Sequence, residues 1–128
     1  MKNALLGTLV VAVVLVLVGQ AFSNGKMDEV DDVAIMVSPQ TLLLSSVQGG
    51  EVSVHSNIPL GLVDRASVEL SGIPAISVGA DSRGALEAKF NEAAVKAIVA
   101  APEATLTLTG AYAAGGTFAA SDTVRVVD

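Results

Sequence analysis

The sequence predicts an all-β domain in which two antiparallel sheets pack face to face. Three observations lead to this fold class. Apolar and polar residues alternate in several short segments, as expected for strands that are buried on one face. Turn residues separate these segments about every ten positions, and no helical segments alternate with the strands, which disfavours a parallel α/β architecture. We therefore expect roughly seven to nine short strands, with one short helix near residues 91–99.

The first three predicted strands are 33–37, 41–45 and 51–58. Pro39 interrupts the chain between the first two, because proline cannot donate a backbone hydrogen bond. In the third segment Val52 and Val54 lie on one face and His55 on the other, which predicts a half-buried strand.

Two shorter strands, 67–71 and 75–78, precede a turn at residues 81–84. In this turn the Asp81 side chain can bond to its own backbone, and Gly84 supplies a positive φ. The next predicted strand is 85–90, and three of its side chains face the core: Leu86, Ala88 and Phe90.

One helical segment interrupts the strands. Asn91 is a favoured N-cap residue and Glu92 suits the first turn of a helix. Val95, Ile98 and Val99 fall at helical spacing, and Ala101-Pro102 ends the segment. We expect a helix of about two turns that closes one end of the sandwich, since so short a helix is not stable alone.

The last two predicted strands are 104–110 and 123–127, joined through a loose turn at 113–116. In the first, leucines face the core and three threonines face outward: Thr105, Thr107 and Thr109. In the second, Val124 and Val126 face inward. Asp122 has the same parity as these valines, so either the strand begins after it or a β-bulge intervenes.

The N-terminal segment has the layout of a secretory signal peptide. Met1-Lys2-Asn3 is a short charged start, residues 4–18 are apolar or small, and small residues follow. We expect cleavage after Ala21 or Ser23; the alternative is an uncleaved membrane anchor. The resulting domain organisation is a signal peptide or anchor at 1–23, an acidic linker at 24–32 and the β-sandwich domain at 33–128.

Composition excludes several classes of function. The chain has no cysteine, which excludes thiol catalysis, disulfides and cysteine-based zinc sites. The formal net charge of −6 opposes binding to nucleic acid and to anionic lipid surfaces. We expect no nucleic-acid partner, and membrane contact only through residues 1–23 if these are not cleaved.

Few residues are candidates for chemistry. His55 is the only histidine, and its parity places it on an outer face, so no Ser-His-Asp arrangement has support. Glu69 and Glu87 sit on outward faces of strands, whereas glycoside hydrolysis needs two carboxylates in a cleft. Tyr112 is expected at a sheet edge, with its hydroxyl bonded locally. No catalytic or cofactor-binding residue and no cofactor is therefore predicted.

Calcium is the one metal that the sequence leaves open. Hard cations bind several converging oxygens. The candidate ligands in loops are Asp64, Asp81 and Asp122, and they lack the dense Asp-x-Asp-x-Asp-Gly spacing of a calcium loop. The simpler interpretation is that these are solvated turn charges. A calcium-binding acidic cluster in the linker at 24–32 is a further alternative.

Several segments resemble a recurring unit of secreted bacterial and archaeal proteins. They are Val-Ser-Pro (37–39), Val-Ser-Val-His-Ser-Asn-Ile-Pro (52–59), Ser-Val-Glu-Leu-Ser-Gly-Ile (67–73), Asp-Ser-Arg-Gly-Ala-Leu-Glu-Ala-Lys-Phe (81–90), Val-Lys-Ala-Ile-Val (95–99), Ala-Thr-Leu-Thr-Leu-Thr-Gly (104–110) and Ser-Asp-Thr-Val-Arg-Val (121–126). Over residues 33–128 the chain resembles small immunoglobulin-like domains, akin to cohesin and bacterial adhesin sandwiches. The resemblance implies an immunoglobulin-like fold and no catalytic residues.

Together these observations predict an exported, non-catalytic extracellular module, secreted or held in the cell envelope. Adhesion, scaffolding or surface assembly through sheet faces and edges is the expected role, with a protein or polysaccharide at the cell surface as partner. The segments 33–45 and 117–127 are the expected edges, where another strand could dock. A carbohydrate- or calcium-binding module is the alternative.

Overall fold

The computed structural model describes residues 32–128. The expected signal peptide at 1–23 and residues 24–31 of the expected linker lie outside the described residues. The strands of the described part are β2 (Ile35–Ser38), β3 (Thr41–Leu43), β4 (Glu51–Pro59), β5 (Val63–Leu70), β6 (Ile73–Pro74), β7 (Ser77–Ala80), β8 (Ala85–Asn91), β9 (Glu103–Tyr112) and β10 (Thr117–Val127). The helices of this part are the 3-10 helix η2 (Leu60–Leu62) and the α-helix α1 (Glu92–Lys96).

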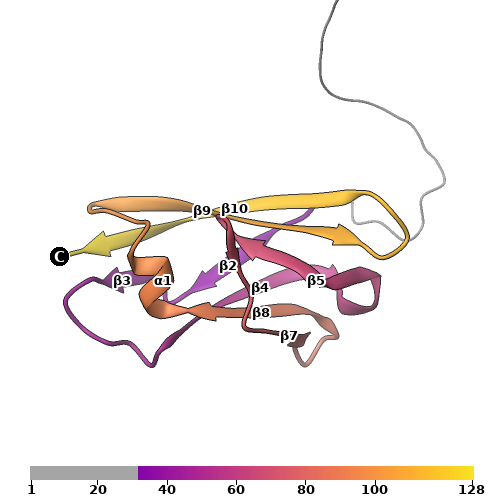
Figure 1. Cartoon of the computed structure of the whole chain (residues 1–128), viewed down its shortest axis with the longest axis horizontal. Helices are drawn as coiled ribbons and strands as arrows, with labels where there is room; N and C mark the ends of the chain where they lie inside the picture. The colour runs from indigo at the N-terminus through magenta and orange to yellow at the C-terminus, as the bar shows by residue number, and fades with distance from the viewer. Residues whose placement is uncertain (1–31) are drawn as a thin grey trace, which may run out of the picture.

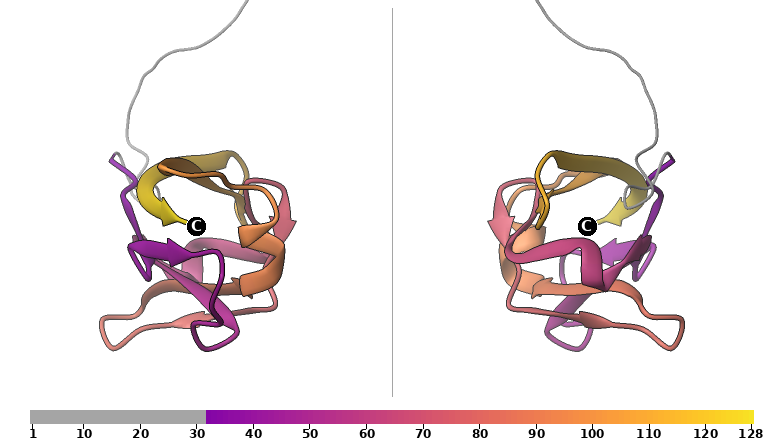
Figure 2. Two further views of the ribbon diagram at one scale, coloured as in Figure 1. Left: turned by 90° about the vertical axis from the view of Figure 1, so that its left-hand side faces the viewer. Right: turned by 90° about the vertical axis from the view of Figure 1, so that its right-hand side faces the viewer.

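The strands form two sheets, and this confirms the expected β-sandwich. One sheet has the order β3-β10-β9-β5-β6 and the other the order β2-β4-β8-β7. Figure 1 shows the long strands running along the longest axis of the domain, with α1 at one end. In the end-on views of Figure 2 the two sheets form separate layers. Among the described residues, no helix is both long and apolar enough to cross a membrane.

Alternate residues of the long strands fill the space between the sheets. In β4, Val52, Val54 and Ile58 are fully buried, whereas Ser53 and His55 are only half-buried. The same alternation holds in β8 and β9, where leucine, alanine and phenylalanine side chains join one core cluster. The predicted inward faces of 51–58, 85–90 and 104–110 are therefore confirmed.

The first part of the domain contributes a strand to each sheet. β2 pairs antiparallel with β4, and after Pro39 the chain crosses to the other sheet, where β3 pairs parallel with the end of β10. Leu43 lies opposite Val127 in this parallel pair. The predicted edge at 33–45 is therefore confirmed. The predicted edge at 117–127 is wrong for its final part, because β3 pairs with Arg125–Val127, whereas residues 117–124 pair with β9 alone.

The two ends of the described chain lie at opposite ends of the sandwich. Ala34 bonds to Asn57 near the end of β4 that leads into η2. Val127 pairs beside Leu43, at the end of the domain where the chain leaves β8 for α1. Figure 1 shows the C-terminus at that end.

Three strands are placed differently from the sequence prediction. β5 begins at Val63 and β10 at Thr117, both several residues earlier than predicted, and β7 covers Ser77–Ala80 in place of 75–78. The early part of β10 is rich in small residues, which carry little apolar signal. Its pairing with β9 nevertheless runs without interruption from Thr117 to Arg125. Both explanations offered for Asp122 are thus wrong, since the strand neither begins after it nor bulges.

The helix is confirmed in position but is shorter than predicted. The Asn91 side chain accepts a hydrogen bond from the Ala94 backbone N–H at 2.9 Å, as expected for an N-cap, and Val95 is fully buried. The helix ends at Lys96. Ile98 and Val99 therefore lie beyond the helix, and Ile98 is 51% exposed.

Candidate functional site

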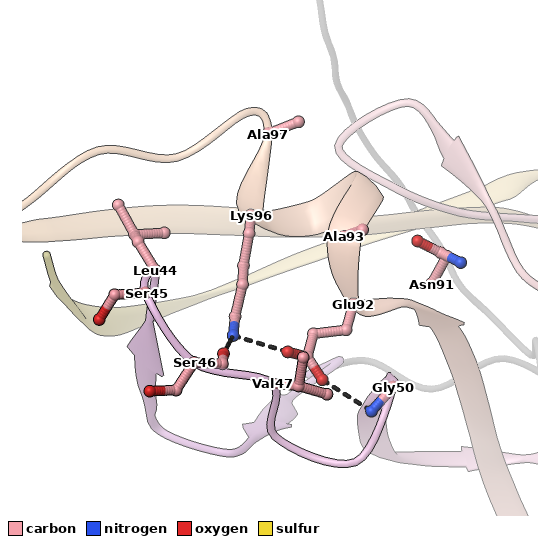
Figure 3. Close-up of a pocket in the computed structure, with 10 residues that line it drawn as sticks. All are labelled: Leu44, Ser45, Ser46, Val47, Gly50, Asn91, Glu92, Ala93, Lys96 and Ala97. Carbon is pink, nitrogen blue, oxygen red and sulfur yellow. Dashed lines mark hydrogen bonds and ion pairs between the residues drawn. The ribbon is translucent and has the colours of Figure 1, made fainter.

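A hollow lies at the end of the sandwich where α1 meets the loop between β3 and β4. Its lining comes from both segments: Leu44, Ser45, Ser46, Val47, Gly50, Asn91, Glu92, Ala93, Lys96 and Ala97. Figure 3 shows Glu92 and Lys96 reaching from α1 toward the loop. The two residues are one helical turn apart, so their side chains lie on the same face of α1.

Glu92 is the only buried acidic side chain of the described residues, and its carboxylate bonds to this loop and to Lys96. Its carboxylate accepts hydrogen bonds from the backbone N–H groups of Gln48, at 2.9 and 3.0 Å, and Gly50, at 2.7 Å. Lys96 Nζ lies 2.6 Å from Glu92 Oε2 and donates to the Ser46 carbonyl at 2.6 Å. The pair therefore ties the loop to α1.

This arrangement keeps Glu92 ionised. The hydrogen bond from Lys96 lowers the pKa of Glu92, and the backbone N–H groups of Gln48 and Gly50 lower it further, while burial acts in the opposite direction. A carboxylate with a lowered pKa and occupied oxygens is a poor general base. Its chemistry fits a structural contact between helix and loop.

A second, shallower hollow lies at the opposite end of the four-stranded sheet, beside the turn at 81–84. It is lined by parts of β2, β4 and the turn, including Met36, His55, Asn57 and Arg83. His55 Nε2 lies 3.6 Å from Glu87 Oε2. Both side chains are on the outer face of the sheet, as predicted for His55 and Glu87.

Asp81 organises the turn beside this hollow. Its carboxylate accepts hydrogen bonds from the backbone N–H groups of Arg83, at 2.8 Å, and Ala85, at 3.1 Å, and pairs with the Arg83 guanidinium at 2.8 Å. The Arg83 side chain is the main cause that lowers the pKa of Asp81 from 3.8 to about 2. Gly84 has a φ of 83°, which confirms the predicted turn.

The structure does not bring the three calcium candidates together. Asp64 lies on β5, Asp81 in the turn between β7 and β8, and Asp122 on β10. The oxygens of Asp81 and Asp122 accept hydrogen bonds from other parts of the chain. Within residues 32–128, no group of three or more histidine, cysteine, aspartate or glutamate side chains could hold a metal ion.

Asp122 has a role that the sequence did not reveal: it closes the outer edge of β2. Ala34 accepts a hydrogen bond from Asn57 of β4, and bonding directions alternate along a strand, so the backbone groups of Val37 point away from β4. Asp122 Oδ2 accepts a hydrogen bond from the Val37 N–H at 2.9 Å. The Gln40 side-chain amide donates to the Val37 carbonyl and to Asp122.

Gln48 closes the outer edge of β3 in the same way. The Leu44 N–H bonds to Val127 of β10, so the backbone groups of Leu43 point away from β10. The Gln48 side chain accepts from the Leu43 N–H at 2.9 Å and donates to the Thr41 carbonyl at 3.0 Å. An added strand would have to displace these side-chain bonds, so neither edge is free for docking at these positions.

The outer face of β9 and β10 carries the predicted threonine row. Thr105 lies opposite Thr123 and Thr107 opposite Ser121, with hydroxyl oxygens 3.1 and 2.7 Å apart. These hydroxyls bond to each other across the strands. The prediction that Tyr112 sits at a sheet edge is wrong, because β9 is an inner strand and Tyr112 is buried, with its ring centroid 5.3 Å from that of Phe118.

Strand order decides the fold family. The strands can be lettered A to G in chain order if β3 and β6 are counted as short additions to the first and third strands. The sheet β2-β4-β8-β7 then reads A-B-E-D, and the sheet that contains β10, β9 and β5 reads G-F-C. This is the immunoglobulin arrangement. The fold is immunoglobulin-like. Among solved structures, the chain is similar to a bacterial immunoglobulin-like domain from the M. primoryensis ice-binding adhesin. The two are 19% identical, with a TM-score of 0.42, over 75% of this chain and 95% of that chain. No protein-family model and no curated protein matches this immunoglobulin-like chain.

Sequence reasoning missed the contact that joins Glu92 of α1 to Gln48 in the loop between β3 and β4. Glu92 was predicted only as a first-turn residue, and no role was predicted for Gln48. Their partners lie on other elements, up to 44 residues away for Glu92 and Gln48. A glutamate four residues before a lysine in a short helix was the one available signal for the ion pair.

Proposed function

We propose that this immunoglobulin-like chain is an exported, non-catalytic extracellular module that serves scaffolding, adhesion or surface assembly as a load-bearing spacer. The observation that carries the proposal is the parallel pairing of β3 with β10, combined with chain ends at opposite ends of the sandwich. The charged start and apolar run at residues 1–18 support export.

The geometry favours resistance to stretching between the two ends. Tension on the chain ahead of β2 and on the chain after β10 pulls in opposite directions along the strand axes. The bonds between β3 and β10, and between β2 and β4, are then loaded together in shear. Strands that slide past each other must break several hydrogen bonds at once, whereas peeled strands lose them one at a time.

The side chains that close the β2 and β3 edges add to the resistance to stretching. Asp122 joins β10 to β2 through the Val37 N–H, and Gln48 holds β3 through the backbone groups of Thr41 and Leu43. Both contacts lie along the load path. A spacer needs such contacts, whereas a module that docked another strand on β2 or β3 would leave these two edges free.

Single-molecule stretching in two directions tests the load-bearing role. The chain has no cysteine, so attachment points can be introduced singly. Pulling between Asp32 and Asp128 loads β3 and β10 in shear, whereas pulling between Ser45, just after β3, and Asp128 peels them apart from one end. We expect a clearly higher unfolding force in the first direction. Equal forces in the two directions would remove the basis of the proposal.

Mass spectrometry of the native N-terminus tests export. We expect a protein that begins at Phe22 or Asn24 in the envelope or medium fraction, which corresponds to cleavage after Ala21 or Ser23. A chain that keeps Met1 and remains inside the cell would contradict an extracellular role.

A further inference from the structure

We propose that the outer face of the four-stranded sheet binds a copper ion at His55. The ligands are the His55 imidazole and its two neighbours across the strands, the Glu87 carboxylate on β8 and the Met36 thioether on β2. This inference goes beyond the spacer role, which needs no metal. It follows from a row of three side chains that the strand register places side by side.

The register of three neighbouring strands puts these donors in one row. Met36 of β2 pairs with His55 of β4, and His55 pairs with Glu87 of β8. All three are accessible on the outer face: Met36 is 61% exposed, and the side chains of His55 and Glu87 are 40% and 24% exposed. Directly opposed residues on adjacent strands have Cβ atoms about 4.5–5.5 Å apart. The central residue, His55, is therefore within reach of both neighbours.

The distance between His55 and Glu87 suits a shared metal ion. His55 Nε2 lies 3.6 Å from Glu87 Oε2, which is too long for a hydrogen bond. Nitrogen and oxygen ligands lie about 2.1 Å from an ion such as zinc, so two of them are about 3.0–3.6 Å apart at bond angles of about 90–120°. An ion of this size can therefore bind between the two side chains with little movement of either.

The surroundings of the row leave room for an ion. Met36 and His55 line the shallow hollow beside the turn at 81–84, which is open to solvent. On the other side of Glu87 the row continues to Gly79 of β7, where a Cβ would meet no atom within 4 Å. Water molecules can therefore complete the coordination of an ion held at this row.

Two basic side chains near the row pair with other carboxylates. Lys89, the basic residue of β8, has its Nζ 4.0 Å from Glu51 Oε1. The Arg83 guanidinium pairs with Asp81 at 2.8 Å. Neither cation thus takes the place of a metal ion beside Glu87.

The chemistry of the three donors selects copper. Among divalent first-row ions, Cu(II) binds nitrogen and oxygen ligands most tightly, and thioethers favour Cu(I). Glu87 therefore favours Cu(II) and Met36 favours Cu(I), while the His55 imidazole is a ligand for both states. Because one ligand is a methionine, the row differs from the groups of three or more histidine, cysteine and carboxylate side chains that residues 32–128 lack.

Copper titration tests the proposal, with the protein purified in the form that the cells produce and freed of metal by a chelator. Calorimetry measures Cu(II) affinity, and competition with a coloured chelator under reducing conditions measures Cu(I) affinity. The variants are His55→Ala, Glu87→Gln and Met36→Leu. The matched controls are Glu69→Gln, at an exposed position on β5 of the other sheet, and Met27→Leu, outside the described residues. Circular dichroism verifies that each variant is folded.

We expect His55→Ala to weaken binding of both copper states about tenfold or more, since loss of even an outer-shell partner costs that much. Glu87→Gln should weaken Cu(II) binding by a similar factor and leave Cu(I) binding nearly unchanged, and Met36→Leu should do the reverse. The two controls should match the wild-type chain. Cu(II) is paramagnetic, so it should broaden the NMR signals of His55 and Gly79 but not those of Thr107 on the other sheet.

Three results would overturn the proposal. One is a wild-type chain that binds neither copper state. The second is copper binding that survives unchanged in His55→Ala. The third is wild-type Cu(II) affinity in Glu87→Gln or wild-type Cu(I) affinity in Met36→Leu, because copper would then bind the imidazole without these neighbours. The stretching experiment needs no metal, so failure of this site and failure of the spacer role are distinguishable.

Discussion

Gly110 lies where β9 and β10 pack closely against each other. It lies opposite Phe118, and a Cβ at this position would approach the Phe118 ring to 2.4 Å. The ring therefore occupies the space that a side chain would take. The Phe118 ring also packs against the Tyr112 ring, with the ring centroids 5.3 Å apart.

We expect Gly110→Ala to lower the free energy of unfolding by about 1–3 kcal/mol, because the added methyl group forces the Phe118 ring to move in a packed core. Urea denaturation measures the change. Gly61→Ala is the control, since a Cβ at Gly61 would meet no atom within 4 Å. If both substitutions have the same small effect, Gly110 is not closely packed against the Phe118 ring.

At this scale, the sequence predicted which side chains are buried but not what they touch. Alternation alone placed Val52, Leu86 and Leu108 in the core, and each is fully buried. The same parity placed Gly110 on an inward position. Its contact with Phe118 depends on the register between β9 and β10, which alternation does not specify.

Among the elements, α1 and the loop between β3 and β4 depend on each other through Glu92. The Glu92 carboxylate satisfies two backbone N–H groups of the loop, and Lys96 reaches both Glu92 and the Ser46 carbonyl. A helix of five residues has little stability of its own. The loop and the helix therefore stabilise each other.

We expect Glu92→Gln to lower the melting temperature and to speed amide exchange at Gln48 and Gly50, because a neutral amide bonds less strongly to Lys96 and to these N–H groups. Thermal denaturation and exchange measured by NMR give the two readouts. The control is Glu103→Gln, which removes the same charge from an exposed position on β9. Equal effects of the two substitutions would show that Glu92 does not hold the loop.

Element positions could be predicted better than element ends. The Asn91 cap and the turn at Asp81 and Gly84 were recognisable because each depends on neighbours within a few residues. The early start of β10 was not, since its stability comes from pairing with β9 along its whole length. Long-range pairing overrides weak local preference in such strands.

For the whole molecule, the two lowered carboxylate pKa values predict a loss of stability in acid. Asp81 has a folded pKa of about 2 against an ordinary value of 3.8, and the pKa of Glu92 is lowered from 4.5. A group with a lowered folded pKa stabilises the fold above its unfolded pKa, and this contribution is lost as pH falls through the folded value.

The free energy of unfolding should therefore decrease as the pH is lowered from about 4.5 toward 2. Urea denaturation at a series of pH values measures this dependence. Asp81→Asn should reduce the dependence of the unfolding free energy on pH below pH 3.8, the ordinary pKa of this carboxyl. A variant whose curve matches that of the wild-type chain would show that the Arg83 contact does not affect stability.

Calcium provides a test of the alternative role as a ligand-binding module. The acidic candidates lie on different elements, and the Asp81 and Asp122 oxygens accept bonds from the chain itself. We expect millimolar calcium to leave the melting temperature unchanged, since a ligand raises it only by binding the folded state. A clear rise that chelator reverses would favour the alternative.

The sequence predicted two packed sheets and the edge at 33–45, but not that another strand covers the end of β10. The segment 117–127 has the small and polar side chains of an edge strand, yet β3 pairs with its final part and closes it. That pairing joins residues more than eighty positions apart, Leu43 and Val127. No local sequence pattern indicates this pairing. The positions of the side chains that close the β2 and β3 edges depend on the same pairing.

Side chains close the β2 and β3 edges and so hold the first two strands on the sandwich. Native-state amide hydrogen exchange at Val37 and Leu43 tests it most directly. Both N–H groups point outward from their sheets and bond to the side chains of Asp122 and Gln48. We expect both amides to be protected, and Asp122→Ala and Gln48→Ala each to remove protection at its own partner. Exchange at the rate of a free amide in the wild-type chain would contradict the account.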